Sequence, residues 1–216
     1  PARRRPSASA VVTTPRLELR NLSKRFGNVI VADGLDLTVS PNQALGIVGP
    51  NGAGKSSLFS MISGDLDPDK GTVLLDGADV TRKRADVRAA HGVGRTFQIP
   101  RPFEGLTVFE NVLVFATSAA GLRKDEANRL AASSLERCGL GDLANQPAGA
   151  LGLLDRKRLE VARALGSDPQ LLLLDEVAGG LTDPEVAPLV DLVNSLKSVG
   201  FTTGWIAHDV HTLLAS

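Results

Sequence analysis

A glycine-rich segment at residues 49–56 reads Gly-Pro-Asn-Gly-Ala-Gly-Lys-Ser. Two glycines that bracket four residues and precede a lysine and a hydroxyl residue form a phosphate-binding loop pattern. In such a loop, backbone N–H groups point at phosphate oxygens, glycines allow close approach, and the following helix offers its positive end. Lys55 can reach the β- and γ-phosphates, and the Ser56 hydroxyl can ligate Mg²⁺. The residues expected to contact the nucleotide are Gly49, Pro50, Asn51, Gly52, Ala53, Gly54, Lys55, Ser56 and Ser57.

An acidic pair, Asp175 and Glu176, follows a run of four leucines at residues 171–174. Hydrolysis of ATP needs a carboxylate on the side of the Mg²⁺ ion and a group that orients or deprotonates water. We expect Asp175 to bind the metal, directly or through a water molecule, and Glu176 to be the general base. An acidic pair after an apolar strand can also be an ordinary solvated strand end, but the phosphate-binding loop favours the functional interpretation.

Three further side chains fall where a nucleotide site can use them. Gln98 ends the segment Arg-Thr-Phe-Gln, and its amide can contact Mg²⁺ or the attacking water. His208 follows a predicted strand and can hydrogen-bond the γ-phosphate. Phe26 precedes Gly27 in an early loop and can stack on adenine. Taken alone, Gln98 would be an ordinary surface glutamine and Phe26 a core phenylalanine.

The strands that must position these groups follow from hydrophobic patterns. Residues 17–20 and 35–39 alternate apolar and polar side chains, which predicts half-buried strands. Residues 44–48, directly before the glycine-rich loop, are apolar without alternation, which predicts a strand covered on both faces. Residues 171–174 and 201–207 are the other expected core strands.

Helices are predicted between these strands. Residues 55–63, 155–165 and 186–196 each place apolar side chains at helical spacing. Asp125 is expected to cap a further helix, with Cys138 on its apolar face as a small core residue rather than a reactive thiol. Strands alternating with helices predict an α/β fold with a mainly parallel sheet, and the early alternating strands predict a small antiparallel sheet beside it.

The chain divides into four segments by residue character. Residues 1–15 are expected to be a tail or linker, with a basic contact to lipid or a partner as the alternative. Residues 16–83 combine the antiparallel β subdomain with the part of the core that carries the glycine-rich loop. Residues 84–150 are expected to form an inserted helical subdomain, and residues 151–216 the remainder of the core.

Composition excludes several classes of protein. The 216 residues include 24 Lys and Arg and 24 Asp and Glu, and a net charge of zero excludes a polycation built for nucleic acid. Hydrophobic residues at 43% and charged residues at 22% exclude wholesale disorder. One cysteine allows no disulfide within the chain and fits a reducing compartment. The longest apolar stretch, residues 112–122, falls short of the roughly 20 residues that span a bilayer.

In this order, these residues resemble the ATP-binding subunits of ABC transporters, over nearly the whole chain from about residue 16. The most similar type serves importers of branched-chain amino acids or of urea and amides. The glycine-rich loop is shared by many ATPases, whereas Arg-Thr-Phe-Gln is more specific to the amino-acid and urea importers. The stretches that carry the resemblance are residues 50–59, 94–98, 106–112, 158–165 and 171–180.

The resemblance implies the P-loop NTPase fold of ABC ATPases, with ATP and Mg²⁺ as cofactors. It assigns Phe26 to adenine stacking, Gln98 to the Q-loop, Asp175 to the Walker B aspartate, Glu176 to the catalytic glutamate and His208 to the switch histidine. The implied partners are membrane-spanning permease subunits and a second ATP-binding subunit, identical or different. No nucleic acid partner and no membrane span of its own are expected. The implied location is peripheral, at the cytoplasmic face of the plasma membrane.

The chain departs from the family pattern at residues 151–155, which read Leu-Gly-Leu-Leu-Asp where the family has Leu-Ser-Gly-Gly-Gln or a near variant. The serine hydroxyl that would meet the γ-phosphate is absent, and Leu154 replaces a glycine. Asp155 adds a negative charge near the start of the following helix. The chain also ends at Ser216, earlier than the subunits it resembles, which predicts a truncation, a fragment or part of a fusion.

Two functions therefore stay open. The chain is either an ATP-hydrolysing motor subunit of an importer or an ATP-dependent dimerisation module that hydrolyses weakly or not at all. An ABC-type protein that acts on ribosomes or DNA is a third reading. A single nucleotide domain, neutral charge and the lack of a basic aromatic groove argue against it.

Overall fold

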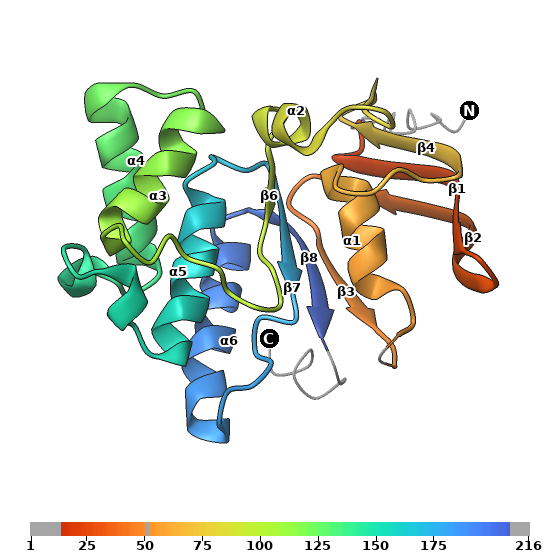
Figure 1. Cartoon of the computed structure of the whole chain (residues 1–216). Coiled ribbons are helices and arrows are strands. Elements are labelled where there is room, and N and C mark those ends of the chain that lie inside the picture. The colour runs from red at the N-terminus through yellow and green to blue at the C-terminus, as the bar shows by residue number, and fades with distance from the viewer. Residues whose placement is uncertain (1–13, 51, 208–216) are drawn as a thin grey trace, which may run out of the picture.

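The computed structural model describes residues 14–50 and 52–207. It contains two four-stranded sheets with helices packed on them, which confirms the predicted α/β fold (Figure 1). The antiparallel sheet has the strand order β2 (Val29–Val39), β1 (Leu17–Phe26), β4 (Lys70–Leu75) and β5 (Ala78–Asp79). The parallel sheet has the order β3 (Ala44–Val48), β8 (Thr202–Ala207), β7 (Leu171–Asp175) and β6 (Val93–Arg95).

Helices connect and cover the strands of the parallel sheet. The helix α1 (Lys55–Ser63) has the predicted bounds and ends at Gly64, whose φ of 87° is a left-handed conformation that favours glycine. The remaining helices are α2 (Ala85–Ala90), α3 (Val108–Ser118), α4 (Lys124–Arg137), α5 (Leu153–Leu165) and α6 (Asp183–Ser198), with short 3₁₀ turns at Gly141–Leu143 and Ala148–Ala150.

The strand β7 is buried on both faces and separates two hydrophobic clusters. Leu171 and Leu173 pack in one cluster with α1 and the antiparallel sheet, and Leu172 and Leu174 pack in the other with α3, α4, α5 and α6. This alternation follows from the two-residue period of a strand. Figure 1 accordingly shows α1 between the two sheets. Because β7 is packed from both sides, the acidic residues at its end have a fixed position.

The strand β3 differs from the prediction in its burial. Its bounds are those expected, but exposed and half-buried residues alternate along it, and Val48 is 44% exposed. The expectation of a strand covered on both faces is therefore wrong for the part of the chain that the structure describes. The reason is its position at the edge of the parallel sheet, where α1 covers one face. A short apolar run cannot by itself distinguish an edge strand from a central one.

The helices α3 and α4 form a helical lobe beside the parallel sheet (Figure 1). Within the predicted helical range 84–150, the strand β6 pairs in parallel with β7, with Val93 opposite Leu171 and Arg95 opposite Leu173. The first part of this range therefore contributes a strand to the core sheet. The domain boundaries stay a prediction.

The start of α4 differs from the expected cap. The N-cap residue is Arg123, which makes no side-chain capping bond, and Asp125 lies in the first turn. The prediction that Asp125 caps this helix is wrong, although its carboxylate still lies near the positive end of the helix. Cys138 is a buried core residue as predicted, and burial raises the pKa of its thiol to about 12.

A buried arginine ties the end of α1 to the segment that precedes α2. Arg88 is fully buried and donates hydrogen bonds to the backbone carbonyls of Met61, Ile62, Thr81 and Lys83. The carbonyls of Met61 and Ile62 belong to the last turn of α1, which has no further helical donors of its own. Arg88 therefore stabilises the helix that carries the glycine-rich loop at its other end.

We predict that Arg88→Ala lowers the free energy of unfolding by about 3–5 kcal/mol, because it leaves several buried carbonyls without a donor. Urea unfolding followed by circular dichroism measures the change. Arg82→Ala is the matched control, since that side chain is 66% exposed, and we expect a change within about 0.5 kcal/mol. Equal stability losses in the two variants would contradict this account.

Candidate functional site

The glycine-rich loop turns directly into α1 and encloses the side chain of Lys55. Gly52 and Gly54 have φ values of 80° and 86°, which glycine adopts without strain. The Lys55 ammonium donates hydrogen bonds to the carbonyls of Gly49 at 2.6 Å and Pro50 at 3.0 Å. The loop thus holds a buried positive charge at the N-terminus of a helix, an arrangement suited to phosphate.

Parallel pairing brings the acidic pair to the end of the sheet formed by the carboxyl ends of its strands, where this loop begins. Val48 at the end of β3 lies opposite Ala207 of β8, and Asp175 at the end of β7 lies opposite Ile206. The Ser56 hydroxyl donates a hydrogen bond of 3.0 Å to Asp175 Oδ1. Two segments 119 residues apart in the sequence therefore meet through these two side chains.

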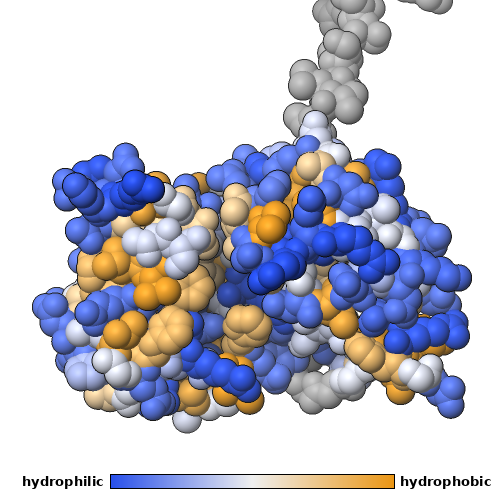
Figure 2. All heavy atoms as spheres, turned by 45° about the horizontal axis from the view of Figure 1, so that its top comes forward, coloured by the Kyte–Doolittle hydropathy of each residue, from blue (hydrophilic) through white to orange (hydrophobic). Residues whose placement is uncertain are grey.

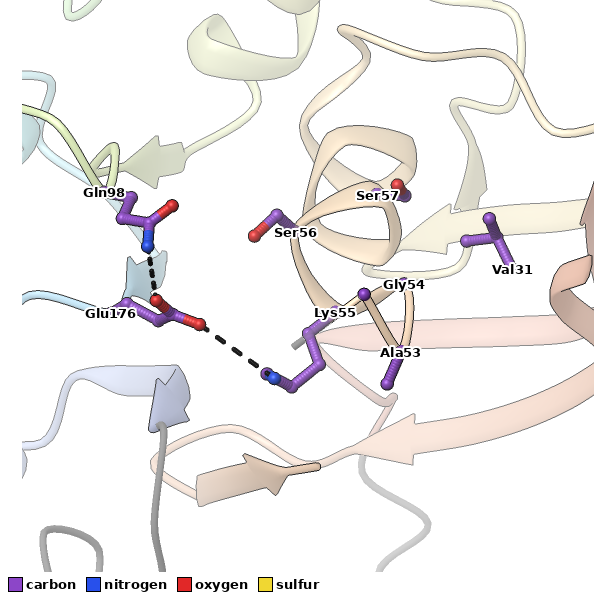
Figure 3. A pocket seen from close by; sticks show the side chains of 9 residues that line it. Val31, Ala53, Gly54, Lys55, Ser56, Ser57, Gln98 and Glu176 are labelled. Carbon is purple, nitrogen blue, oxygen red and sulfur yellow. Dashed lines mark hydrogen bonds and ion pairs between the residues drawn. The ribbon is translucent and has the colours of Figure 1, made fainter. Parts of the chain in front are cut away.

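The second acidic residue reaches across to the lysine of the loop. Glu176 Oε1 lies 3.9 Å from Lys55 Nζ, and the Gln98 amide donates a 2.6 Å hydrogen bond to Glu176 Oε2 (Figure 3). Glu176 has a φ of 44°, a conformation that costs a non-glycine residue about 1–2 kcal/mol. Its N–H donates to the carbonyl of Ile206 at 3.1 Å, which holds the residue at the end of the sheet.

These side chains line one pocket of about 280 Å³. In Figure 3, dashed lines connect Gln98 to Glu176 and Glu176 to Lys55, and Ser56 and Ser57 lie on the first turn of α1. The amide oxygen of Gln98 is turned away from Glu176 (Figure 3). The lining residues are Val31, Gly52, Ala53, Gly54, Lys55, Ser56, Ser57, Gln98 and Glu176.

Oxygen donors beside this pocket fit a magnesium ion. Mg²⁺ prefers hard oxygen ligands and is usually held by one or two carboxylates together with phosphate oxygens and water. The Ser56 hydroxyl and the Asp175 carboxylate lie within hydrogen-bond distance of each other, and Gln98 can add its amide oxygen. Among the residues described, no cluster of three or more His, Cys, Asp or Glu side chains could hold a metal alone. This donor set suits an ion that also binds phosphate oxygens.

Four predicted residues within the described part of the chain are not among those that line this pocket: Phe26, Gly49, Pro50 and Asp175. Phe26 is at the end of β1, where its ring is 50% exposed, and it is not among the residues that line the pocket. The Lys24 ammonium lies 5.3 Å from the centre of that ring. Asn51 and His208 lie outside the described residues.

Sequence reasoning missed two cations that face the acidic pair. Lys157 of α5 is buried and donates a 2.8 Å hydrogen bond to the backbone carbonyl of Gln98. Burial lowers the pKa of Lys157, while the charges of Glu176 and Glu160 raise it. Arg95 Nη2 lies 3.2 Å from Asp175 Oδ2. Lys157 lies on the apolar face of the helix predicted at residues 155–165, and a charged side chain in that position was the available signal.

A second hollow of about 430 Å³ opens beside Gln98 on the side of the helical lobe. Phe97 and Ile99 on its wall are 48% and 67% exposed. Beneath them, Arg163 forms a 2.6 Å ion pair with Glu160, whose pKa burial raises. Figure 2 shows apolar side chains gathered over the helical lobe, with a depression between the lobe and the sheets. This exposed apolar wall suits contact with another protein.

The ABC transporter family matches residues 32–179, a range that includes the glycine-rich loop, Gln98 and the acidic pair. The chain belongs to the ABC transporter family. As an ATP-binding subunit of this family, it is an ATPase.

Relatives of this ABC subunit include amino-acid transport proteins. It is 35% identical over 219 residues to the high-affinity branched-chain amino acid transport ATP-binding protein BraF of Pseudomonas aeruginosa, covering 94% of this chain and 86% of that protein. It is 34% identical over 218 residues to LivG of Escherichia coli strain K12, which has the same description, with the same coverage.

Solved structures of ABC cassettes share its fold. The ADP conformation of MJ1267, an ATP-binding cassette of an ABC transporter, superposes with a TM-score of 0.83 at 31% identity, covering 94% of this chain and 84% of the other. A nucleotide-free ATP-binding cassette from an ABC transporter gives a TM-score of 0.82 at 30% identity, covering 93% and 84%. Within the described residues, none of the helices of this ABC subunit has the length and apolar character needed to cross a membrane.

We predict that Gly54→Ala in this ABC subunit weakens ATP binding at least about tenfold. A Cβ atom at Gly54 would lie 2.6 Å from Val31 Cγ1 and 2.9 Å from the Val31 carbonyl, at a φ that disfavours alanine. Titration calorimetry measures the affinity. Gly152→Ala is the matched control, because a Cβ there meets nothing within 4 Å; a similar loss in both variants would contradict the prediction.

Proposed function

We propose that this ABC subunit is the ATP-hydrolysing motor of an importer for branched-chain amino acids. The contact between Lys55 and Glu176 carries the proposal, because it sets a phosphate-binding cation opposite a carboxylate that can activate water. The role of the relatives BraF and LivG in branched-chain amino acid transport, at 35% and 34% identity, supports the choice of solute.

In the proposed reaction, the loop amides and Lys55 hold the β- and γ-phosphates, and Glu176 accepts a proton from the water that attacks the γ-phosphorus. The new phosphorus–oxygen bond forms as the bond to the bridging oxygen of ADP breaks, so ATP and water give ADP and phosphate. Gln98 orients Glu176 through its 2.6 Å hydrogen bond. Mg²⁺ held by Ser56, Asp175 and Gln98 would neutralise phosphate charge. His208 is proposed to contact the γ-phosphate, and Phe26 to stack on adenine.

The proposed partners are permease subunits that span the membrane and a second ATP-binding subunit, identical or different. The apolar wall formed by Phe97 and Ile99 supports a docking role for the hollow beside Gln98. The subunit would then lie peripherally at the cytoplasmic face of the plasma membrane.

The segment at residues 151–155 favours a second candidate function, a dimerisation module that binds ATP and hydrolyses it only weakly. Gly152 is the N-cap of α5 and provides no side-chain cap, and Leu153 is 44% exposed. Asp155 forms an ion pair of 3.3 Å with Arg158 and adds negative charge at the first turn of α5. A phosphate approaching this turn would meet apolar groups and a carboxylate.

We predict that Glu176→Gln lowers ATP turnover at least about a hundredfold while ATP affinity changes less than about threefold, because the amide keeps the shape but accepts no proton. Phosphate release and calorimetry measure the two quantities. Glu126→Gln is the matched control, since Glu126 is exposed on α4. Equal turnover in the wild type and in Glu176→Gln would refute the assignment of the base.

The two candidate functions differ in their response to a restored segment. We expect the double substitution Gly152→Ser with Leu154→Gly to raise turnover by less than about threefold if the native segment supports hydrolysis. A gain above about tenfold would favour the dimerisation module. The same double substitution combined with Glu176→Gln is the control, and it stays inactive if the gain comes from this site.

A further inference from the structure

We infer that Arg95 is a positioning residue that serves as the resident counter-charge of Asp175 and thereby limits how strongly Mg²⁺ tightens ATP binding. The inference rests on the proposed ATP and Mg²⁺ site, and it concerns a residue outside the loop and the acidic pair. Arg95 ends β6, the strand next to β7 in the parallel sheet. Its side chain points at the carboxylate of Asp175, which also accepts a hydrogen bond from the Ser56 hydroxyl.

Both carboxylate oxygens of Asp175 accept hydrogen bonds from side chains of the protein. Oδ1 accepts a hydrogen bond of 3.0 Å from the Ser56 hydroxyl, and Oδ2 accepts one of 3.2 Å from Arg95 Nη2. The two charged side chains are only 3% and 8% exposed. A carboxylate so buried needs a paired cation or a metal, since an isolated buried charge is strongly unfavourable. Arg95 supplies that cation at the place where a metal would also have to act.

The geometry makes Arg95 and a metal ion competitors for one carboxylate. Two like charges a few ångströms apart repel appreciably even at the effective dielectric of a protein surface. A cation that binds Ser56 and Asp175 therefore either tolerates the guanidinium beside it or displaces its hydrogen bond. In both cases, Arg95 reduces the net free energy of metal binding.

Asp65 gives Arg95 a second anionic partner. Arg95 Nη1 lies 3.1 Å from Asp65 Oδ2, whose side chain is 41% exposed, and it also donates to the hydroxyls of Ser60 and Ser63 on α1. The guanidinium can therefore release Asp175 without losing its pairing. The guanidinium carbon of Arg95, Cζ, also lies 4.9 Å from the ring centre of Phe97, one residue before Gln98. Arg95 thus connects the metal-side carboxylate, the loop that carries Gln98, and α1.

The inference makes predictions of opposite sign for Arg95 and for its second partner, Asp65. The quantity to compare is the ratio of the dissociation constants of adenylyl imidodiphosphate in EDTA and in Mg²⁺, which is the factor by which the metal tightens binding. We expect Arg95→Gln, which keeps a donor and removes the charge, to raise this ratio by about tenfold. We expect Asp65→Asn, which leaves Asp175 as the remaining anion for Arg95, to lower it by about threefold.

The experiment is a calorimetric titration of the full chain, with Arg95→Lys and Arg82→Gln as controls. Arg95→Lys keeps the charge, and Arg82→Gln removes the same charge from a side chain that is 66% exposed; both should keep the wild-type ratio. A ratio that is unchanged or lower in Arg95→Gln, or unchanged or higher in Asp65→Asn, would overturn the inference. If Arg95→Gln fails to fold, Asp65→Asn decides. A wild-type chain that binds no analogue in either buffer would overturn the proposed site itself, and the inference with it.

Discussion

The nucleotide site depends on the parallel pairing of β3, β8 and β7. Because all three strands run the same way, the glycine-rich loop after Val48 and the acidic pair at the end of β7 emerge at one edge of the sheet, with β8 between them. Packing of β7 from both faces fixes the position of Asp175. The helix α1 packs between the two sheets and fixes the positions of Ser56 and Lys55. The contact between Ser56 and Asp175 is the direct result. Everything that the site can do chemically follows from this convergence.

Charge is balanced within the site by cations that come from three separate elements. Lys55 of α1 faces Glu176, and Arg95 of β6 pairs with Asp175. Lys157 of α5 donates a hydrogen bond to the carbonyl of Gln98, whose amide in turn bonds Glu176. A site that must hold both a carboxylate pair and a polyphosphate needs several cations close to it. The cations also link the loop, the sheet and the helical side of the molecule.

The local parts of the fold could be predicted from the sequence, and the contacts between distant segments could not. The bounds of α1 and of β3 follow from side-chain spacing and from glycine at each end of the helix. The exposed face of β3 could not be predicted, because position within a sheet is set by other strands. Arg95 and Lys157 could not be predicted as site residues for the same reason. Arg95 meets Asp175, 80 residues away, and Lys157 meets Gln98, 59 residues away. Gln98 and Glu176 were predicted as site residues, but the hydrogen bond between them was not.

Displacement calorimetry tests most directly whether the convergence of loop and acidic pair forms a polyphosphate site. The chain is first saturated with ATP in Mg²⁺ and then titrated with inorganic triphosphate or with adenosine. Inorganic triphosphate should displace ATP if the loop amides and Lys55 hold the phosphates as proposed, whereas adenosine at equal concentration should not. The absence of heat on adding ATP, or displacement by adenosine but not by triphosphate, would contradict the account.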